Sequence, residues 1–282
     1  MKVHQSPISN PQSPQKYQSL PMFSFPPYPP LFWPTAVFAI LIIGISKAGL
    51  GGGIGAIATP LLALFIPVAD AAALLLPILI VADLLSMQHY RQQFDRDSLW
   101  ILLPSGLVGI VLGSLFFNYF RGNEQLLKTG IGVIGLLFVL FQVSRALILR
   151  SLAGARPSTP IGLLLGTAAG FTSTLAHVGG PPVAIYLLPQ KLPRHLFVGT
   201  TVVFFMVVNI VKLIPYAFLG LLRVGNIGTT LLLLPVTFVG VQLGAWLNGR
   251  LNENLFNAIV YTLLTLTSLE LILGFNLIEL LF

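Results

Sequence analysis

The sequence has 282 residues, of which 55% are hydrophobic and only 8% are charged, and its mean hydropathy is +0.90. Soluble domains carry about 25% charged residues, so this chain cannot cover a globule with solvated side chains, and disordered, coiled-coil, nucleic-acid-binding and ordinary cytosolic proteins are excluded. The net charge of +7 comes from only 15 lysines and arginines, most of them between apolar runs, which is typical of a membrane protein with several spans.

Residues 1–30 form a tail rich in proline, serine and glutamine that ends in the sequence FPPYPP. The tail has no apolar segment of the kind found in a cleavable signal peptide, and we expect it to be disordered. The chain contains no cysteine, and its four histidines are scattered, so we expect no disulfide, metal site or cofactor.

Six apolar runs follow that are long enough to cross a bilayer, which takes about 20 residues. Short polar segments separate most of them. The sequence therefore predicts an all-α membrane protein with spanning helices at about 70–90, 98–120, 125–149, 192–222, 228–249 and 255–280.

Two further apolar stretches are interrupted. The stretch 31–66 is broken at 47–53 (KAGLGGG) into halves of 16 and 13 residues, and the stretch 160–189 is broken at 177–182 (HVGGPP). At 1.5 Å per residue each half of the first stretch is too short to cross, and both together are too long. A re-entrant helix pair fits these lengths, and interrupted helices at matching places in two halves indicate a transporter's binding site.

The two halves of the chain share a pattern of small motifs, which predicts an internal repeat. We expect repeats at 31–150 and 151–282, each with a broken helix pair and three spanning helices. Because three is odd, the repeats would have inverted topology. The matching pairs are Leu103-Pro104 with Leu234-Pro235, Val108-Gly109 with Val239-Gly240, Leu112-Gly113 with Leu243-Gly244, Gly52-Gly53 with Gly179-Gly180, and Asp83 with Asn209.

The basic residues between the spans predict the orientation. With re-entrant pairs, one face receives 8 loop lysines and arginines and the other 3, whereas full crossings would give 6 against 5. We expect the protein to lie in the cell membrane, which is the inner membrane where a cell has two. The positive-inside rule then predicts that the face with eight basic residues, which includes the loop at 150–159, is cytoplasmic and that both termini lie outside.

Two sets of residues follow in a fixed order along the chain. They are Gly49, Gly51, Gly52, Gly53 and Pro60 in the first half, and Gly179, Gly180, Pro181, Arg194, Thr200, Asn209, Lys212, Tyr216 and Gly220 in the second. In these residues the sequence resembles the sulfite exporter TauE/SafE family over roughly residues 35–280. The resemblance implies a permease for small sulfur-containing or carboxylate anions that uses no ATP. The sequence departs from the family pattern at His177. This residue lies in the second break, at a place where the first break has glycine.

Lys47, in the first break, and Lys212, within an apolar run, are the candidate anion ligands. Charges at membrane depth are costly and usually face a cavity or a partner. For Lys212 the alternative is that its side chain reaches an interface. Asp83 would pair with a buried lysine or carry a coupling proton, and pairing is the simpler account. His177 would titrate with the substrate or serve as a hydrogen-bonded turn residue, and Asn209 is a further substrate-binding candidate.

The glycines of the two breaks would let an anion approach the start of a short helix, where backbone N–H groups carry partial positive charge. The alternative is that they only allow close packing. Pairs of the form Gly-x-x-x-Gly would serve helix contacts within the chain or in a homodimer. The candidate substrate-binding glycines are Gly49, Gly51, Gly52, Gly53, Gly179 and Gly180.

The leading hypothesis is a secondary transporter that exports a small anion, such as sulfite or an organosulfonate, by alternating access in the lipid bilayer. The alternative is an anion channel lined by the same re-entrant segments. An enzyme is not expected, because the chain has neither His-Glu-x-x-His nor Gly-x-Ser-x-Gly.

Overall fold

The computed structural model describes residues 28–49, 54–88, 93–152, 157–222, 224–247 and 253–274, and within these ranges every regular element is a helix. Of the predicted tail, only residues 28–30 fall inside the described part. Six described helices are long and apolar enough to span a membrane, in agreement with the six predicted runs. They are α3 (Val68–Met87), α4 (Arg96–Phe120), α5 (Glu124–Leu152), α8 (Arg194–Phe218), α9 (Val224–Leu247) and α10 (Glu253–Leu273).

The two interrupted stretches are interrupted in the structure as well. The first contains α1 (Phe32–Gly49), the 3-10 helix η1 (Ile54–Ile57) and α2 (Ala58–Ala63). The second contains α6 (Thr159–Ala176), α7 (Gly180–Leu187) and the 3-10 helix η2 (Leu188–Gln190).

The limbs of each broken stretch differ in length more than expected. Both α1 and α6 have 18 residues, about 27 Å of helix, whereas α2 has 6 and α7 has 8. Lys47 and Ala48 favour helix, so α1 continues to Gly49, and Lys47 lies in its last turn rather than in the break. At the end of α6, His177 adopts the left-handed conformation (φ 56°), which stops the helix.

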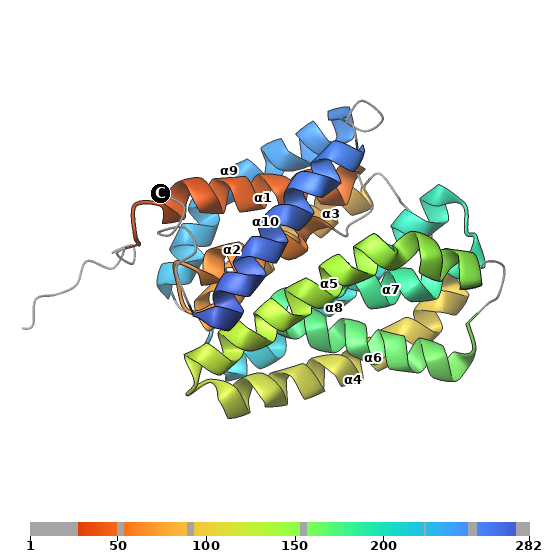
Figure 1. The fold of residues 1–282 in the computed structure, drawn as a ribbon, viewed down its shortest axis with the longest axis horizontal. Helices are drawn as coiled ribbons and strands as arrows, with labels where there is room; N and C mark the ends of the chain where they lie inside the picture. Colours follow the sequence, from red (N-terminus) through yellow and green to blue (C-terminus); the bar gives the residue numbers. More distant parts are fainter. Residues whose placement is uncertain are drawn as a thin grey trace, which may run out of the picture.

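Helices from the first half of the chain pack in pairs with helices from the second half (Figure 1). α1 runs beside α9, α4 beside α6, α5 beside α10, and α3 beside α8. Residues 71 to 76 of α3 are fully or almost fully buried, so this helix forms part of the core.

Glycine permits the closest of these contacts. A Cβ atom added to Gly44 of α1 would lie 2.5 Å from the backbone of Gly240 in α9, and one added to Gly170 of α6 would collide with the backbone of Gly106 in α4. These glycines therefore serve helix contacts within the chain.

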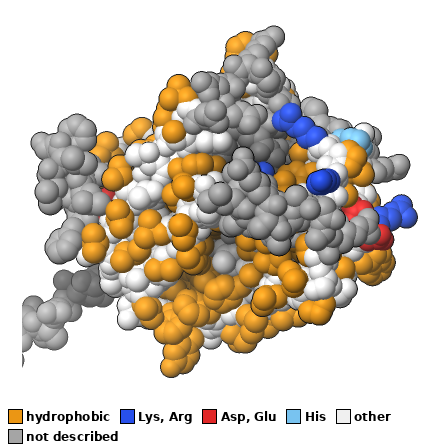
Figure 2. Space-filling model, turned by 45° about the vertical axis from the view of Figure 1, so that its right-hand side comes forward, with side chains coloured by type: hydrophobic (Ala, Val, Ile, Leu, Met, Phe, Trp, Pro, Cys, Tyr) orange, Lys and Arg blue, Asp and Glu red, His pale blue; other side chains and the backbone are white. Residues whose placement is uncertain are grey.

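Apolar side chains cover much of the outer surface. Figure 2 shows hydrophobic side chains over most of one face, with charged side chains gathered at its edge. Such a surface suits contact with lipid rather than water. Strongly exposed apolar residues include Trp100, Val143, Leu164, Phe218 and Leu231.

Candidate functional site

A cavity lies where the ends of the two broken helices meet α3 and α8. Its volume is about 40 Å³, enough for about three waters at 10–15 Å³ each. Its polar lining residues are Lys47, Asp83, Ser173, His177, Thr201 and Asn209, and apolar ones include Ile43, Leu79, Val198, Val202 and Phe205.

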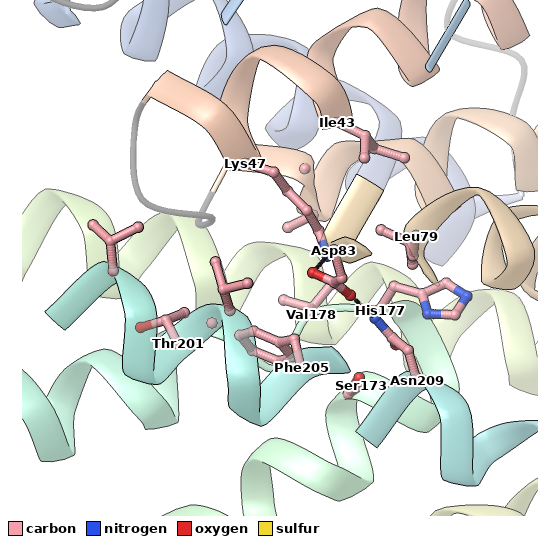
Figure 3. A pocket seen from close by; sticks show the side chains of 15 residues that line it. Ile43, Lys47, Leu79, Asp83, Ser173, His177, Val178, Thr201, Phe205 and Asn209 are labelled. Atoms are coloured by element: carbon pink, nitrogen blue, oxygen red, sulfur yellow. Dashed lines mark hydrogen bonds and ion pairs between the residues drawn. The ribbon is translucent and has the colours of Figure 1, made fainter. Parts of the chain in front are cut away.

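Three side chains from three helices form the polar centre of the cavity (Figure 3). Lys47 of α1 forms an ion pair with Oδ1 of Asp83 on α3. Asn209 of α8 donates from Nδ2 to Oδ2 of the same carboxylate at 2.7 Å. Both residues line the cavity, and at 11% exposed against 1% for Asp83, Lys47 is the more accessible of the two.

A second cation lies behind one wall of this cavity. Lys212 of α8 is fully buried and does not line the cavity. Its Nζ donates to the carbonyl of Ser173 at 2.9 Å, to the hydroxyl of Ser173 at 3.1 Å and to Nδ1 of His177 at 2.9 Å. These three acceptors match the three N–H bonds of an ammonium.

The same contacts assign a tautomer to His177. Because Nδ1 accepts from Lys212, the ring proton resides on Nε2, which donates to the carbonyl of Ala72 on α3 at 3.0 Å. His177 thereby ties the end of α6 to α3.

The formal charges in and behind the cavity do not cancel. Among the described residues there, Lys47 and Lys212 contribute two positive charges and Asp83 one negative charge. Lys47 and Asp83 neutralise each other at the cavity, so the further electrostatic attraction for an anion comes from Lys212 behind the wall.

The start of α7 contributes less than the sequence suggested. Gly180 lines the cavity. However, Pro181 and Pro182 follow it and carry no N–H, so the first turn of α7 offers fewer backbone donors than an ordinary helix start. In the first half, the segment after the break begins as a 3-10 turn at Ile54 rather than as an α-helix.

The structure brings five of the predicted site residues together at the cavity, namely Lys47, Asp83, His177, Gly180 and Asn209. Two others do not line it: Lys212 lies behind the wall, and a Cβ atom on Gly179 would meet the ring of Phe205 at 2.7 Å. Gly49 is the last residue of α1. The predicted residues Gly51, Gly52 and Gly53 lie outside the described part of the chain.

Ser173, Thr201 and Phe205 line the cavity and were not predicted from the sequence. Helical spacing carried a signal for them. Phe205 and Thr201 precede Asn209 by one and two turns on the same face of α8, and Ser173 precedes His177 by four residues.

Neither a curated protein nor a solved structure matches the chain. A family model, described as the sulfite exporter TauE/SafE, matches residues 36–271, which include all six candidate spans except the last two residues of α10. Members of this family are membrane transporters rather than enzymes, and the six apolar helices agree with an integral membrane protein. The chain belongs to the TauE/SafE sulfite exporter family.

Proposed function

We propose that this protein is a secondary permease that exports a small oxyanion by alternating access, with the anion bound in the cavity beside Lys47. The observation that carries the proposal is an ammonium group at a cavity enclosed by apolar helices. A charge is kept at such a depth where it meets a partner or a substrate. The candidate substrates are sulfite, small organosulfonates and small carboxylates.

The size of the cavity favours the smaller of these anions. Space for only a few water-sized groups favours a small anion over a large one. Sulfite and methanesulfonate are among the smallest candidates. Longer organosulfonates and carboxylates would need the cavity to widen.

We further propose that the chain consists of two inverted repeats, at 31–150 and 151–282, each with a re-entrant helix pair. The reciprocal packing supports this arrangement, since α1 of the first half packs on α9 and α6 of the second half packs on α4. Asp83 and Asn209, 126 residues apart, occupy matching positions and contact each other. Two equivalent residues meet in this way only at the axis that relates the repeats.

The cavity extends to one side of that axis, which supports alternating access. On α8 it reaches back from Asn209 to Val198. A shift of 126 residues takes Val198, Thr201 and Val202 to Ala72, Leu75 and Leu76 of α3. Ala72, Leu75 and Leu76 are all 0% exposed. The corresponding route along α3, toward the opposite face, is therefore closed by packed side chains.

The proposed orientation follows from the loop charges. The N-terminal end of α8, toward which the cavity extends, belongs to the face with 8 loop lysines and arginines. The positive-inside rule makes this the cytoplasmic face of the inner membrane, with both termini outside. The cavity would then be accessible to an anion leaving the cytoplasm.

Flux measurements in proteoliposomes test the function. We expect saturable uptake of labelled sulfite that is accelerated by unlabelled sulfite on the opposite side, with protein-free liposomes as the control. Flux without saturation or countertransport would identify a channel instead. No protein-dependent flux of sulfite, methanesulfonate or acetate would overturn the proposal.

A further inference from the structure

The cation that faces the cavity is already neutralised. Among the described lining residues Lys47 carries the only ammonium group, and that group is bound to Asp83. An anion that binds Lys47 must therefore displace, or share the lysine with, a carboxylate that the protein itself supplies.

Displacement would leave Asp83 in an unfavourable state. The carboxylate is 1% exposed, and its one remaining described partner would be the neutral amide of Asn209. A second negative charge would now lie beside it in the same cavity. Burial and a neighbouring negative charge both disfavour the ionised form of a carboxyl group and favour its protonation.

We propose that Asp83 takes up one proton when an anion binds Lys47, an inference that rests on the anion transport proposed above. The anion and the proton then cross the membrane together. The proton comes from the water that fills the open cavity. It binds Oδ1, the oxygen that Lys47 releases, while Oδ2 still accepts from Asn209. On release of the anion, Asp83 loses the proton to water and the ion pair forms again.

Other titratable groups near Asp83 are less suited to this role. The helices packed on α3 present Lys47 from α1, Lys212 from α8 and His177 at the end of α6, whereas α5 meets it through Glu124 at its first residue, Val68. Protonation of His177 would place a second cation beside Lys212 and break the bond from Lys212 to Nδ1. The described parts of α2 and α9 contain no charged residue.

The pairing also explains how the empty protein avoids carrying an unpaired charge at the cavity. With Asp83 bound to Lys47, the polar centre is neutral, and the empty carrier is able to return across the membrane. Asp83→Asn would remove this internal counter-ion. We therefore expect the variant to exchange anions across the membrane while its net transport is lost.

Calorimetry on the purified full-length protein, in buffers of different ionisation enthalpy, measures protons taken up per anion bound. The probes are sulfate and methanesulfonate, whose charge is constant near neutral pH, with sulfite alongside them. The wild type should take up about one proton per anion, and the apparent Kd should rise up to about tenfold per pH unit once Asp83 is ionised. Asp83→Asn should bind at least as tightly, with no proton uptake and no pH dependence.

Asp70→Asn is the matched control, because it makes the same change on the same helix outside the cavity, and it should behave as the wild type. For sulfite, which itself titrates near neutral pH, the count is the difference between the wild type and Asp83→Asn. If Asp83→Asn does not fold, the number of protons that the wild type takes up with sulfate and methanesulfonate still tests whether anion binding is coupled to proton uptake.

Anion binding without proton uptake would overturn the coupling and leave the proposed function standing. Proton uptake that persists in Asp83→Asn and disappears in His177→Gln would assign the proton to the histidine and refute the role of Asp83. The absence of any anion binding would refute the proposed function, and the coupling with it.

Discussion

Lys47 combines two favourable settings for a buried ammonium. It lies in the last turn of α1, where the partial negative charge of the helix end stabilises a cation, and it is paired with Asp83. The same side chain reaches the cavity. A bound anion and Asp83 would therefore compete for the ammonium group of Lys47. A substitution of Lys47 alone removes both contacts, so its effect cannot be assigned to either one.

Lys47→Ala should weaken anion binding. A hydrogen bond to a charged group contributes about 1.5–3 kcal/mol, so the Kd should rise roughly ten- to a hundredfold, and Lys47→Arg should retain part of the affinity. Titration calorimetry on the purified protein measures the change. Lys47→Ala/Asp83→Asn separates a lost ligand from a stranded carboxylate, and Lys128→Ala on α5 is the control outside the cavity. An unchanged Kd in a folded Lys47→Ala protein would exclude the lysine as a ligand.

The sequence located the charged residues of the site because charge is conspicuous in an apolar chain. Lys47, Asp83 and Lys212 stand out for this reason. Their pairing could not be predicted, because it depends on how three helices pack. The position of Lys212 behind Ser173, rather than in the cavity, is likewise a property of the packing.

At the scale of elements, the break after α6 presents buried backbone carbonyls that need partners. Two side chains of α8, one turn apart, supply them. Lys212 donates to the carbonyl of Ser173, and the hydroxyl of Tyr216 donates to the carbonyl of Thr174 at 2.7 Å. The interruption is therefore stabilised by α8 as well as by its own turn.

Tyr216→Phe should destabilise the protein. The hydroxyl is fully buried, and its loss leaves the carbonyl of Thr174 without this donor, a cost of about 1–3 kcal/mol. Thermal unfolding in detergent should show a lower midpoint. Tyr119→Phe, at a side chain that is 82% exposed, is the matched control. Equal midpoints for the two variants would show that the hydroxyl does not support the helix end.

Gly170→Ala should disturb the contact between α6 and α4. The added Cβ atom would collide with the backbone of Gly106, which cannot move as a side chain would. Overpacking of this kind costs about 1–3 kcal/mol or more. Size-exclusion chromatography and thermal unfolding in detergent report the effect.

Gly130→Ala on α5 is the control, since nothing lies within 4 Å of its added Cβ atom, and alanine favours helix over glycine by about 1 kcal/mol. This variant should be as stable as the wild type or more so. A Gly170→Ala protein that matches it would refute close packing at this position.

The number and type of the spanning helices followed from the sequence, because twenty apolar residues in a row have few alternatives in a bilayer. Both stretches predicted to be interrupted are interrupted, but Lys47 and Gly180, predicted to lie in the breaks, belong to α1 and α7, and the lengths of the limbs differ from those predicted. Helix propensity carries α1 through Lys47 to Gly49, and the limbs after the breaks contain only short α-helices.

For the whole molecule, alternating access can be tested with single introduced cysteines, because the sequence contains none. The test compares the cavity beside α8 with the buried positions on α3 that correspond to it in the proposed repeat. Thr201→Cys lines the cavity, and Leu75→Cys is its counterpart on the filled side. In inside-out vesicles an impermeant thiol reagent should label Thr201→Cys, and bound anion should slow the labelling. Leu75→Cys should remain unlabelled from that face.

Right-side-out vesicles complete this test. During transport, Leu75→Cys should gain reactivity toward the outside, and a cysteine introduced near residue 155 should stay unlabelled. Labelling of Thr201→Cys from outside in the resting protein would reverse the proposed orientation. Labelling of both cysteines from both faces at once would indicate a continuous pore.

The contact between Asp83 and Asn209 bears on stoichiometry. Two identical halves related by a two-fold axis would place like residues face to face there. Two aspartates would repel each other, and two asparagines would offer no acid group. An acid opposite its amide, of nearly equal size and joined by a 2.7 Å hydrogen bond, retains the geometry of a symmetric pair while leaving one ionisable group. If the chain is built from two inverted repeats, as proposed, this position gives the centre of the molecule one carboxylate per chain instead of two.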